Sequence, residues 1–289
     1  MRSHPADYEL VTPKNLDAVL QLLHNEPGQW TPIAGGTEIM VLYGAGKLPL
    51  RQFVSIAVTE LREIAEDSEW ISIGGGCSFT QIRRHAGIQH HFPLFAECAS
   101  WTGGIANQNR ATIGGNLANA SPAADSPPAL FAYGAELELI SARRRRRIPY
   151  DQFHLGYKRT ALAPDELIGA VLLRKRFDDS LRYVRKVGTR KAQAISKICV
   201  AATARIHHGR VNEIRIGMGS VAPTPLRLAA TERVLIGSTL NDAALLEARR
   251  ALVSETAPID DIRSTAAYRT LVAGNLLEEM LRTFAGAAR

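Results

Sequence analysis

Apolar positions in the first part of the chain repeat with the spacing of an amphipathic helix. The segment after Thr12-Pro13 carries apolar residues three and four positions apart, at Leu16, Val19, Leu20 and Leu23. This spacing predicts a helix, with Thr12 as its expected N-cap, Pro13 as its first residue and Gly28 as its stop signal. A short apolar run, Trp30–Ala34, then predicts a buried strand that ends in Gly35-Gly36-Thr37, before a helical segment at residues 38–43.

The middle of the chain alternates between short strand-like runs and helical segments. Strands are predicted near Phe53–Ile56, at Trp70–Ile73 and at Glu136–Ile140. Helices are predicted through Phe79–Arg83 with Ser78 as N-cap, through Leu94–Cys98, and near Ser126–Tyr133. The glycine- and asparagine-rich stretch Thr102–Asn119 is expected to be a long loop.

The last third of the chain shows a different pattern. From about Asp179 the sequence alternates with a period of two, which places Ile198, Val200, Ala202, Ala204 and Ile206 on one face of a strand and Ile214, Ile216 and Met218 on one face of the next. His207-His208-Gly209 is the expected turn between them. Two helices, near Asp242–Glu255 and Ala266–Phe284, are predicted to follow. Antiparallel strands followed by terminal helices indicate an α+β domain, with a boundary near residues 177–179.

Composition excludes several classes of protein. The chain has 289 residues, 46% hydrophobic and 22% charged, which is typical of a globular protein of two or three domains. We expect no membrane span, because no run of about 20 apolar residues is present. The N-terminal residues lack the pattern of a secretory signal, so we expect a cytoplasmic location. The net charge of +7 favours an anionic ligand or an acidic partner.

The densest basic run is Arg143–Arg147. We expect a solvent-exposed basic turn there, and a surface for a protein partner is the alternative. Nucleic acid is the least favoured ligand, because no aromatic residues are interleaved with the arginines and no nucleic-acid-binding motif accompanies them.

Cysteines and histidines do not predict a metal site. Cys77, Cys98 and Cys199 lie far apart and match no cluster-ligand spacing, so we expect buried free thiols in a reducing compartment. The adjacent pairs His90-His91 and His207-His208 are expected to point apart, as neighbours in a strand do. No HExxH or comparable spacing occurs, and we name no catalytic residue in this chain.

Two glycine segments carry the candidate chemistry. The first is "AGGTE" at Ala34–Glu38, and the second is "TIGGN" at Thr112–Asn116. Glycine allows the backbone to approach a ligand closely, and a helix start adds free N–H groups, so each segment has the chemistry of a phosphate cradle. Either segment alone is more often a simple turn. Together they can hold a diphosphate from two sides, although neither matches the P-loop or the GxGxxG motif.

Three blocks of sequence resemble one known family. "PIAGGTEI", "NRATIGGNLANASPAADSPPAL" and "GYKRTALAPDELI", in this order, are similar to the FAD-binding medium subunit of molybdenum hydroxylases, the family of xanthine, carbon monoxide and nicotinate dehydrogenases. The resemblance covers roughly residues 8–276. It implies an FAD-binding domain of the vanillyl-alcohol-oxidase-like type at residues 1–177, in two parts of about 1–57 and 58–177, and a C-terminal α+β domain at 178–289.

The resemblance also implies which residues contact FAD. The first group would wrap the diphosphate and comprises Ile33, Ala34, Gly35, Gly36, Thr37, Glu38 and Ile39. The second cradle would comprise Ala111, Thr112, Gly114, Gly115 and Asn116, with Asn119 and Ala124 beside it. Some relatives have an aromatic residue at the position of Thr102, next to which this chain has Trp101.

Four further residues are assigned to FAD by the same resemblance. Asp125 would accept a hydrogen bond from a sugar-alcohol hydroxyl without a partner cation; its alternative role is that of a helix N-cap. Leu167 and Ile168 would pack on the flat surface of the cofactor. Lys186 would lie near the flavin, and its alternative role is that of an exposed strand lysine.

The resemblance implies an electron-transfer function that needs partners. Electrons would come from [2Fe–2S] clusters of an iron–sulfur subunit and pass through FAD to NAD, oxygen or another acceptor. Molybdopterin would belong to a third subunit, in a heterotrimer or its dimer. Two other functions stay open: a self-sufficient FAD-dependent oxidase with its own substrate pocket, and a basic scaffold without a cofactor.

Overall fold

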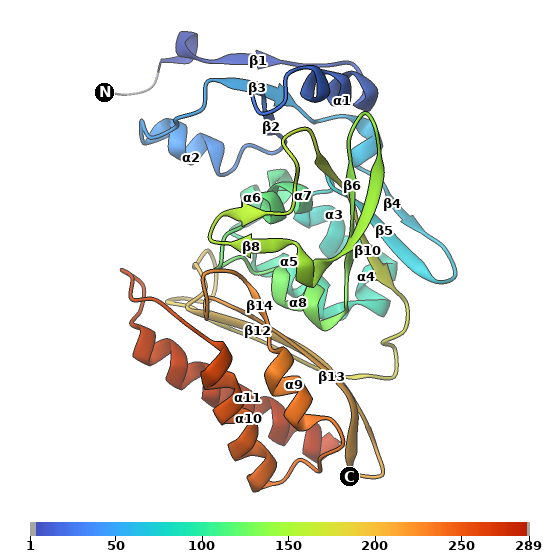
Figure 1. The fold of residues 1–289 in the computed structure, drawn as a ribbon, viewed down its shortest axis with the longest axis vertical. Helices are drawn as coiled ribbons and strands as arrows, with labels where there is room; N and C mark the ends of the chain where they lie inside the picture. The colour runs from blue at the N-terminus through green and yellow to red at the C-terminus, as the bar shows by residue number, and fades with distance from the viewer. Residues whose placement is uncertain (1–3, 288–289) are drawn as a thin grey trace.

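Three β-sheets of three or more strands follow one another along the length of the molecule (Figure 1). The structure is a computed structural model, which describes residues 4–287. The first sheet lies near the N-terminus, the second is in the middle with most of the short helices, and the third lies at the other end against the two longest helices. Each sheet contributes to its own cluster of buried apolar side chains.

The first sheet is parallel and has the order β1-β3-β2. Its elements are β1 (Glu9–Val11), β2 (Thr31–Ile33), β3 (Gln52–Ser55), α1 (Leu16–Asn25) and α2 (Ile39–Gly44), after the short 3₁₀ turn η1 (Pro5–Asp7). The predicted helix α1 is confirmed, but its predicted start is wrong. Asn15 is the N-cap and its side chain accepts a hydrogen bond from the Ala18 N–H at 2.9 Å. Asparagine caps better than threonine, and here it directly precedes the first apolar position, Leu16.

The second sheet is antiparallel in all its pairings and has the order β4-β5-β10-β6-β7. Its strands are β4 (Ile64–Glu66), β5 (Trp70–Gly74), β6 (Glu136–Ile140), β7 (Arg145–Pro149) and β10 (Leu167–Arg174). The strands predicted at Trp70–Ile73 and Glu136–Ile140 are confirmed. A small hairpin of β8 (His154–Gly156) and β9 (Arg159–Thr160) and the 3₁₀ turns η2 (Thr59–Leu61) and η3 (Tyr150–Gln152) complete this part.

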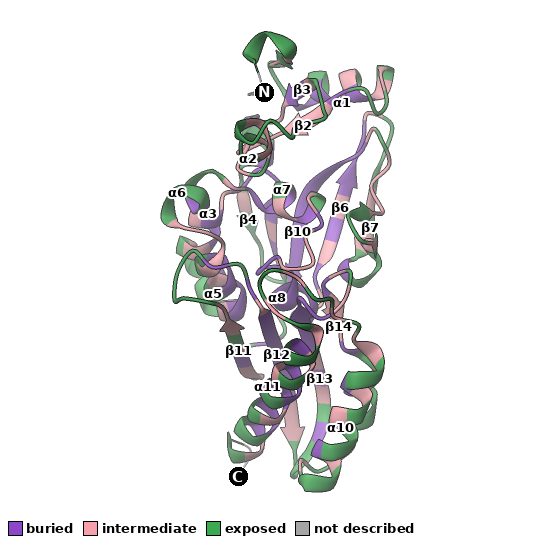
Figure 2. Cartoon of the chain, turned by 90° about the vertical axis from the view of Figure 1, so that its left-hand side faces the viewer, coloured by how far each residue is buried: buried purple, intermediate pink, exposed green. Residues whose placement is uncertain are grey.

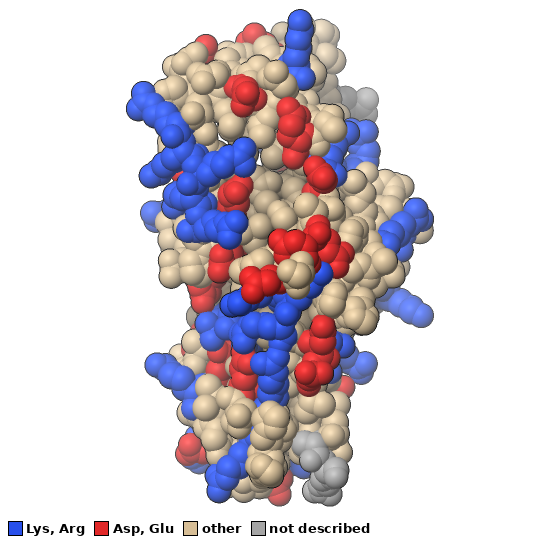
Figure 3. Space-filling model, turned by 90° about the vertical axis from the view of Figure 1, so that its right-hand side faces the viewer, with Lys and Arg blue, Asp and Glu red and all other residues tan. Residues whose placement is uncertain are grey.

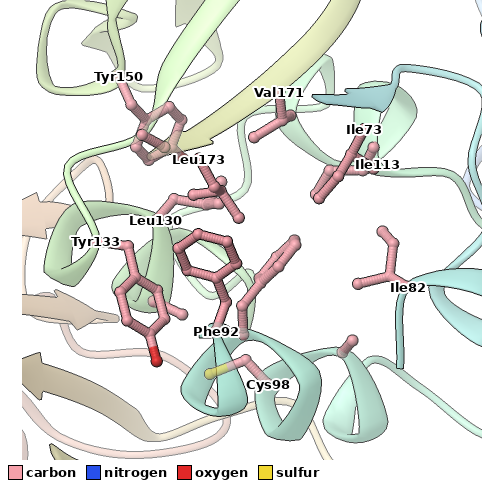
Figure 4. Close-up of a cluster of buried hydrophobic side chains, with 14 of the residues drawn as sticks. Ile73, Ile82, Phe92, Cys98, Ile113, Leu130, Tyr133, Tyr150, Val171 and Leu173 are labelled. Atoms are coloured by element: carbon pink, nitrogen blue, oxygen red, sulfur yellow. The ribbon is translucent and has the colours of Figure 1, made fainter. Parts of the chain in front are cut away.

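Six short helices pack beside the second sheet: α3 (Phe79–Arg84), α4 (Ala86–His91), α5 (Pro93–Trp101), α6 (Ile105–Arg110), α7 (Ile113–Ala118) and α8 (Pro127–Ala132). Ser78 is the N-cap of α3 as predicted, in a capping box with Gln81. Two expectations fail. The stretch Thr102–Asn119 is not a loop but contains α6 and α7, and His90-His91 lies at the end of helix α4 rather than in a strand. Phe92 and Tyr133 pack edge to face in the core between helices and sheet, with ring centroids 5.1 Å apart, and Tyr150 belongs to the same cluster (Figure 4).

The run Arg143–Arg147 is not simply a solvated turn. Only Arg143 and Arg144 lie in the connection between strands, and Arg145–Arg147 belong to β7, which pairs with β6. Alternation along the strand turns Arg146 inward to Glu166, whose side chain is 1% exposed. Arg144 also pairs with Glu166, at 3.2 Å, and Arg145 with Glu138, at 3.1 Å. Three of the five positive charges are therefore paired within the chain. Basic and acidic side chains also lie next to one another across the middle of the face in Figure 3.

The third sheet is antiparallel, with the order β11-β12-β13-β14. Its elements are β11 (Leu181–Val187), β12 (Ile198–His207), β13 (Arg210–Gly219) and β14 (Leu226–Arg227), with α9 (Ala229–Leu235), α10 (Asp242–Glu255) and α11 (Ala266–Ala287). The two predicted strands and the two terminal helices are confirmed. The turn is also confirmed: His208 and Gly209 both have positive φ, +51° and +72°, as a two-residue hairpin turn requires.

Both faces of β12 are buried, although alternation predicted one buried face. Ile198, Val200, Ala202 and Ala204 belong to the core beneath the terminal helices. On the opposite face, Ala201 joins the core of the middle part and the Thr203 hydroxyl donates to the Ala132 carbonyl of α8 at 2.9 Å. Ile206 is only half-buried, because the β12–β13 register shifts between Arg205 and Ile206. The third sheet is thus the layer that joins the two halves of the chain.

Two simple properties complete the fold. Cys77, Cys98 and Cys199 are free and buried, as expected. Within residues 4–287, none of the helices combines the length and the apolar character needed to cross a membrane.

The Glu166 carboxylate yields a prediction on stability. It accepts hydrogen bonds from Arg146, Arg144 and the Ala163 N–H, and the Arg146 guanidinium lowers its pKa to about 2. Loss of one partner of a fully buried ion pair costs about 3–5 kcal/mol, and the partial exposure of both arginines reduces this to about 2 kcal/mol for Glu166→Gln. Urea unfolding followed by tryptophan fluorescence measures it, since Trp30, Trp70 and Trp101 all lie in the first half of the chain. The matched variant Glu138→Gln, whose partner Arg145 is exposed, should cost less than about 0.5 kcal/mol; equal losses would contradict this reasoning.

His154 predicts a pH dependence. Its Nε2 lies 2.8 Å from the Tyr150 hydroxyl, its Nδ1 is buried without a partner, and burial lowers its pKa to about 4 from 6.5. In the unfolded chain the imidazole of His154 takes up a proton as the pH falls below 6.5, whereas in the folded chain it does so only near pH 4. The free energy of unfolding therefore decreases as the pH falls through this window. The free energy of unfolding should be about 2 kcal/mol lower at pH 5 than at pH 7 from this residue alone. His154→Gln should remove that part of the slope and the exposed His207→Gln should not; identical slopes in both variants would exclude His154 as the cause.

Candidate functional site

The first glycine segment presents a row of unused backbone donors. Among residues 4–287, the N–H groups of Gly35, Gly36, Thr37, Glu38 and Ile39 have no hydrogen-bond acceptor. The carbonyl groups of Gly36 and Glu38 start helix α2 by accepting from Met40, Val41 and Leu42. Gly36 has φ +71°, a conformation that glycine adopts without strain. The segment is half-exposed, so these donors are available to a ligand with several acceptor oxygens.

The second glycine segment differs from the first. Its backbone donors are used within the chain: Ile113 donates to Cys77, Gly114 to Gly75, and Asn116 to the Thr112 carbonyl, at 2.8–3.0 Å. Thr112 is the N-cap of α7, and its hydroxyl accepts from the Gly115 N–H at 3.2 Å. The expectation that "TIGGN" repeats the donor chemistry of "AGGTE" is therefore wrong, because its glycines serve packing and capping. What it offers a ligand is the exposed surface of Gly115 and the amide N–H₂ of Asn116.

Close backbone contacts bring the two segments together. A Cβ atom at Gly35 would lie only 1.7 Å from the Arg110 carbonyl oxygen, directly before Ala111 and Thr112. In the same way, Gly114 packs on the Gly75 carbonyl and Gly75 on the Ile168 carbonyl, where added Cβ atoms would approach to 2.6 and 2.0 Å. Figure 2 shows the outcome: α2, α6 and α7 lie near one another on one side of the molecule.

Asp125 lies at the boundary between the two domains and does have a partner cation. Its Oδ2 accepts from Lys186 Nζ at 2.7 Å and its Oδ1 from the Ser196 hydroxyl at 2.5 Å. Lys186 Nζ also donates to the Trp101 carbonyl at 3.1 Å. The two charged side chains are 9% and 11% exposed. Burial raises the pKa of Asp125, and the Lys186 ammonium opposes that rise.

Both alternatives considered for these residues are excluded. Asp125 does not cap α8, because Ser126 occupies the N-cap position and Asp125 faces Lys186. Lys186 is not an exposed strand lysine, although it lies in β11. Ser196 was not predicted from the sequence; an isolated serine on a loop carries no signal of its own.

The other predicted residues lie around these two groups. The Thr102 hydroxyl donates to the Cys98 carbonyl, and the Asn119 side chain accepts from Lys158 Nζ at 2.8 Å. Ile33 ends strand β2, Ala111 donates to the Asn107 carbonyl, and Ala124 is 8% exposed. The side chains of Leu167 and Ile168 are almost covered by protein, at 4% and 5% exposed, so little of them is left for a flat ligand surface. Lys158, in the "GYKRT" block, was missed as a neighbour of this region.

These residues fit the phosphate part of FAD. Five consecutive backbone donors suit a diphosphate, whose oxygens accept hydrogen bonds and whose charge matches the overall positive charge of the chain. The Asn116 amide, the Thr37 hydroxyl and the Lys186–Asp125 pair add polar groups nearby. Contact of each of these side chains with FAD stays a prediction.

Gly115 allows a direct test of this arrangement. A Cβ atom there would meet only the Thr112 hydroxyl, at 3.0 Å, and would otherwise project outward, whereas at Gly104 it would meet the movable end of the Gln193 side chain. Gly115→Val should weaken FAD binding by at least about tenfold, or ~1.4 kcal/mol, and Gly104→Val should weaken it less. Flavin content per chain by absorbance measures this, with circular dichroism as the folding control. Equal flavin content in the two folded variants would contradict the assignment of Gly115.

Comparisons with known proteins show the family of this chain. The family model described as "FAD binding domain in molybdopterin dehydrogenase" matches residues 6–173, and the model described as "CO dehydrogenase flavoprotein C-terminal domain" matches residues 183–284. The chain is 30% identical over 273 residues to the xanthine dehydrogenase FAD-binding subunit of Escherichia coli, covering 93% of each chain. It is 27% identical over 278 residues to the carbon monoxide dehydrogenase medium chain of Hydrogenophaga pseudoflava, covering 96% of each.

A solved structure has the same fold. Carbon monoxide dehydrogenase from Hydrogenophaga pseudoflava, in a form that lacks the Mo-pyranopterin moiety of the molybdenum cofactor, contains a chain that superposes with a TM-score of 0.91 at 28% identity, covering 96% of this chain and 97% of that one. The fold expected from the sequence, an FAD-binding domain followed by an α+β domain, is confirmed. The chain belongs to the family of FAD-binding medium subunits of the xanthine dehydrogenase and carbon monoxide dehydrogenase type, which are oxidoreductase subunits.

Proposed function

We propose that this chain is the electron-transfer flavoprotein of a multi-subunit molybdenum hydroxylase. It accepts electrons from the [2Fe–2S] clusters of an iron–sulfur subunit and passes them to NAD, oxygen or another small acceptor. Molybdopterin belongs to a separate subunit that oxidises the organic substrate, in a heterotrimer or its dimer. The proposed location is the cytoplasm, and the proposed domain boundary lies at residues 177–178.

The proposal rests on one observation. The five backbone N–H groups of Gly35–Ile39 have no acceptor within the described residues, and Gly35 packs against the Arg110 carbonyl, two residues before Thr112. This chain's own part is to bind and orient the cofactor. The backbone of Gly35–Ile39 would donate to the phosphates, and the contacts at Gly35 and Gly114 fix where these donors lie relative to the second glycine segment. FAD, when bound, would supply the redox chemistry.

The need for partners is supported by what the chain holds and by its relatives. The chain has three cysteines, all buried: the thiols of Cys98 in α5 and Cys199 in β12 contact each other, and Cys77 follows β5. Three thiols are fewer than the Cys₄ set that holds a [2Fe–2S] cluster. The relatives named above are called a subunit and a medium chain, which describes parts of larger assemblies. A self-sufficient oxidase would need a substrate pocket beside the flavin, and no observation favours one.

Stopped-flow reduction tests this function. The isolated chain with FAD should be reduced slowly by any candidate organic substrate, whereas the assembled complex should be reduced within turnover time, because electrons reach the flavin only through the docked iron–sulfur subunit. The measurement is the bleaching of the visible absorbance of oxidised flavin. Fast bleaching in the isolated chain would overturn the electron-relay function and establish the self-sufficient oxidase.

A further inference from the structure

A cluster of histidines and carboxylates lies outside the cofactor site. His90 and His91 end helix α4, and Asp178 follows the last residue of the first domain core, Phe177. One ligand atom from each of His90, His91 and Asp178 lies within 4.8 Å of the others. The expectation that the two histidines point apart is wrong: their rings are 4.5 Å apart, because the helix ends here and Phe92 leaves the helical conformation.

His91 lies between two carboxylates, and its Nδ1 contacts the proposed partner ligand Asp178. Its Nδ1 lies 3.0 and 3.1 Å from the two oxygens of Asp178, and its Nε2 lies 3.9 Å from Glu66 Oε1 on the other side of the ring. Histidine ligands in proteins usually direct their second ring nitrogen at a carboxylate, which orients the ring and raises its basicity. Glu66 lies on the Nε2 side of the ring, beyond direct hydrogen-bond distance, and is paired with Lys175.

The ligand residues are held in place by the fold. Phe92, directly after His91, and Phe177, directly before Asp178, are both at most 1% exposed. Arg182 donates to the carbonyl oxygens of Phe177 and Asp178, at 3.2 and 2.9 Å, which fixes the backbone at Asp178. The His91 side chain itself is 18% exposed. The side chains of His90 and Asp178 are exposed, and Asp178 is oriented by its contact with His91 Nδ1.

We propose that His90, His91 and Asp178 bind a divalent ion of the late transition metals, of the zinc, copper or nickel class. Two imidazoles and one carboxylate suit these metals and not magnesium or calcium, which prefer oxygen ligands. Water fills the remaining positions. Such an ion would join helix α4 of the first domain to the segment around Asp178 that leads into the second domain. It would therefore cross-link α4 to this interdomain segment.

The charged side chains around the cluster influence its affinity for a divalent ion. Two carboxylates, Asp178 and Glu66, face the histidines, and Lys175 pairs with Glu66 at 2.6 Å. Arg182 lies on the backbone side of Asp178. His85 binds its own helix start through Nδ1, which accepts from the Ile88 N–H at 3.4 Å. The cations partly offset the negative charge of the two carboxylates, so affinity depends on the two imidazoles and the Asp178 carboxylate together.

The experiment uses the full-length chain, purified with FAD and without a histidine tag. Titration with Zn²⁺ by calorimetry gives stoichiometry and affinity, and Co²⁺ serves as an optical probe of nitrogen ligation. We expect one Zn²⁺ per chain, a higher unfolding temperature in excess Zn²⁺, and a loss of affinity of at least about tenfold in His90→Ala and in Asp178→Asn. Glu66→Gln changes a residue that is not a ligand, so it should weaken Zn²⁺ binding less than Asp178→Asn does and leave the shape of the cobalt spectrum unchanged.

The chain offers a matched control in its second adjacent pair, His207-His208. Both residues are exposed on the β12–β13 turn, and within the described residues they do not belong to a three-ligand group. The double variant His207→Ala/His208→Ala should bind Zn²⁺ as the unchanged chain does. The proposal is overturned if Zn²⁺ affinity is the same in His90→Ala as in the unchanged chain, or if the control variant loses binding equally. Flavin content, measured in every variant, separates this site from the cofactor site, because it should not change.

Discussion

The arrangement of the candidate site depends on backbone packing against backbone at three glycines. Gly35 contacts the Arg110 carbonyl, Gly114 contacts Gly75, and Gly75 contacts the Ile168 carbonyl of β10. No side chain fits at any of these positions, because even a methyl group would overlap a peptide group. The contacts tie α2 and α7 to the middle sheet, so the free donors of the first segment lie at a fixed place relative to the second.

The two glycine segments differ in how their backbone N–H groups are used. The backbone N–H groups of the first segment have no acceptor within the described residues, whereas those of residues 113–116 are used within the chain. The first segment can therefore donate to a ligand, and the second holds the first in place. Two consecutive glycines in "TIGGN" have opposite tasks: Gly114 is buried against Gly75, and Gly115 is exposed. Glycine costs more conformational entropy on folding than other residues. In these two segments it is tolerated because it allows a close backbone contact, as at Gly114, or leaves the backbone open to a ligand, as at Gly115.

The domains are joined by the third sheet and by polar contacts at its edge. Small residues on the second face of the sheet let α8 approach: a Cβ atom at Gly217 would lie 2.3 Å from the Pro128 carbonyl. Asp125 of the first domain binds Lys186 and Ser196 of the second. Residues assigned to the cofactor thus come from both domains, and a change in how the domains pack would alter the site. The His90–His91–Asp178 cluster crosses the same boundary elsewhere.

The sequence by itself determined the elements with strong periodicity and the family. Helix α10 and the strands β6, β12 and β13 follow from spacing alone, because apolar side chains must share one face. The resemblance of three sequence blocks, in their order, to one family indicated FAD and the FAD-binding medium-subunit family. Tertiary structure decided what depends on neighbours distant in sequence: that Arg146 turns inward to Glu166, that Lys186 pairs with Asp125, and that the donors of residues 113–116 are already used. A local pattern reports which face of an element is apolar, but hydrogen-bond partners and close backbone contacts are set by segments that meet only when the chain folds.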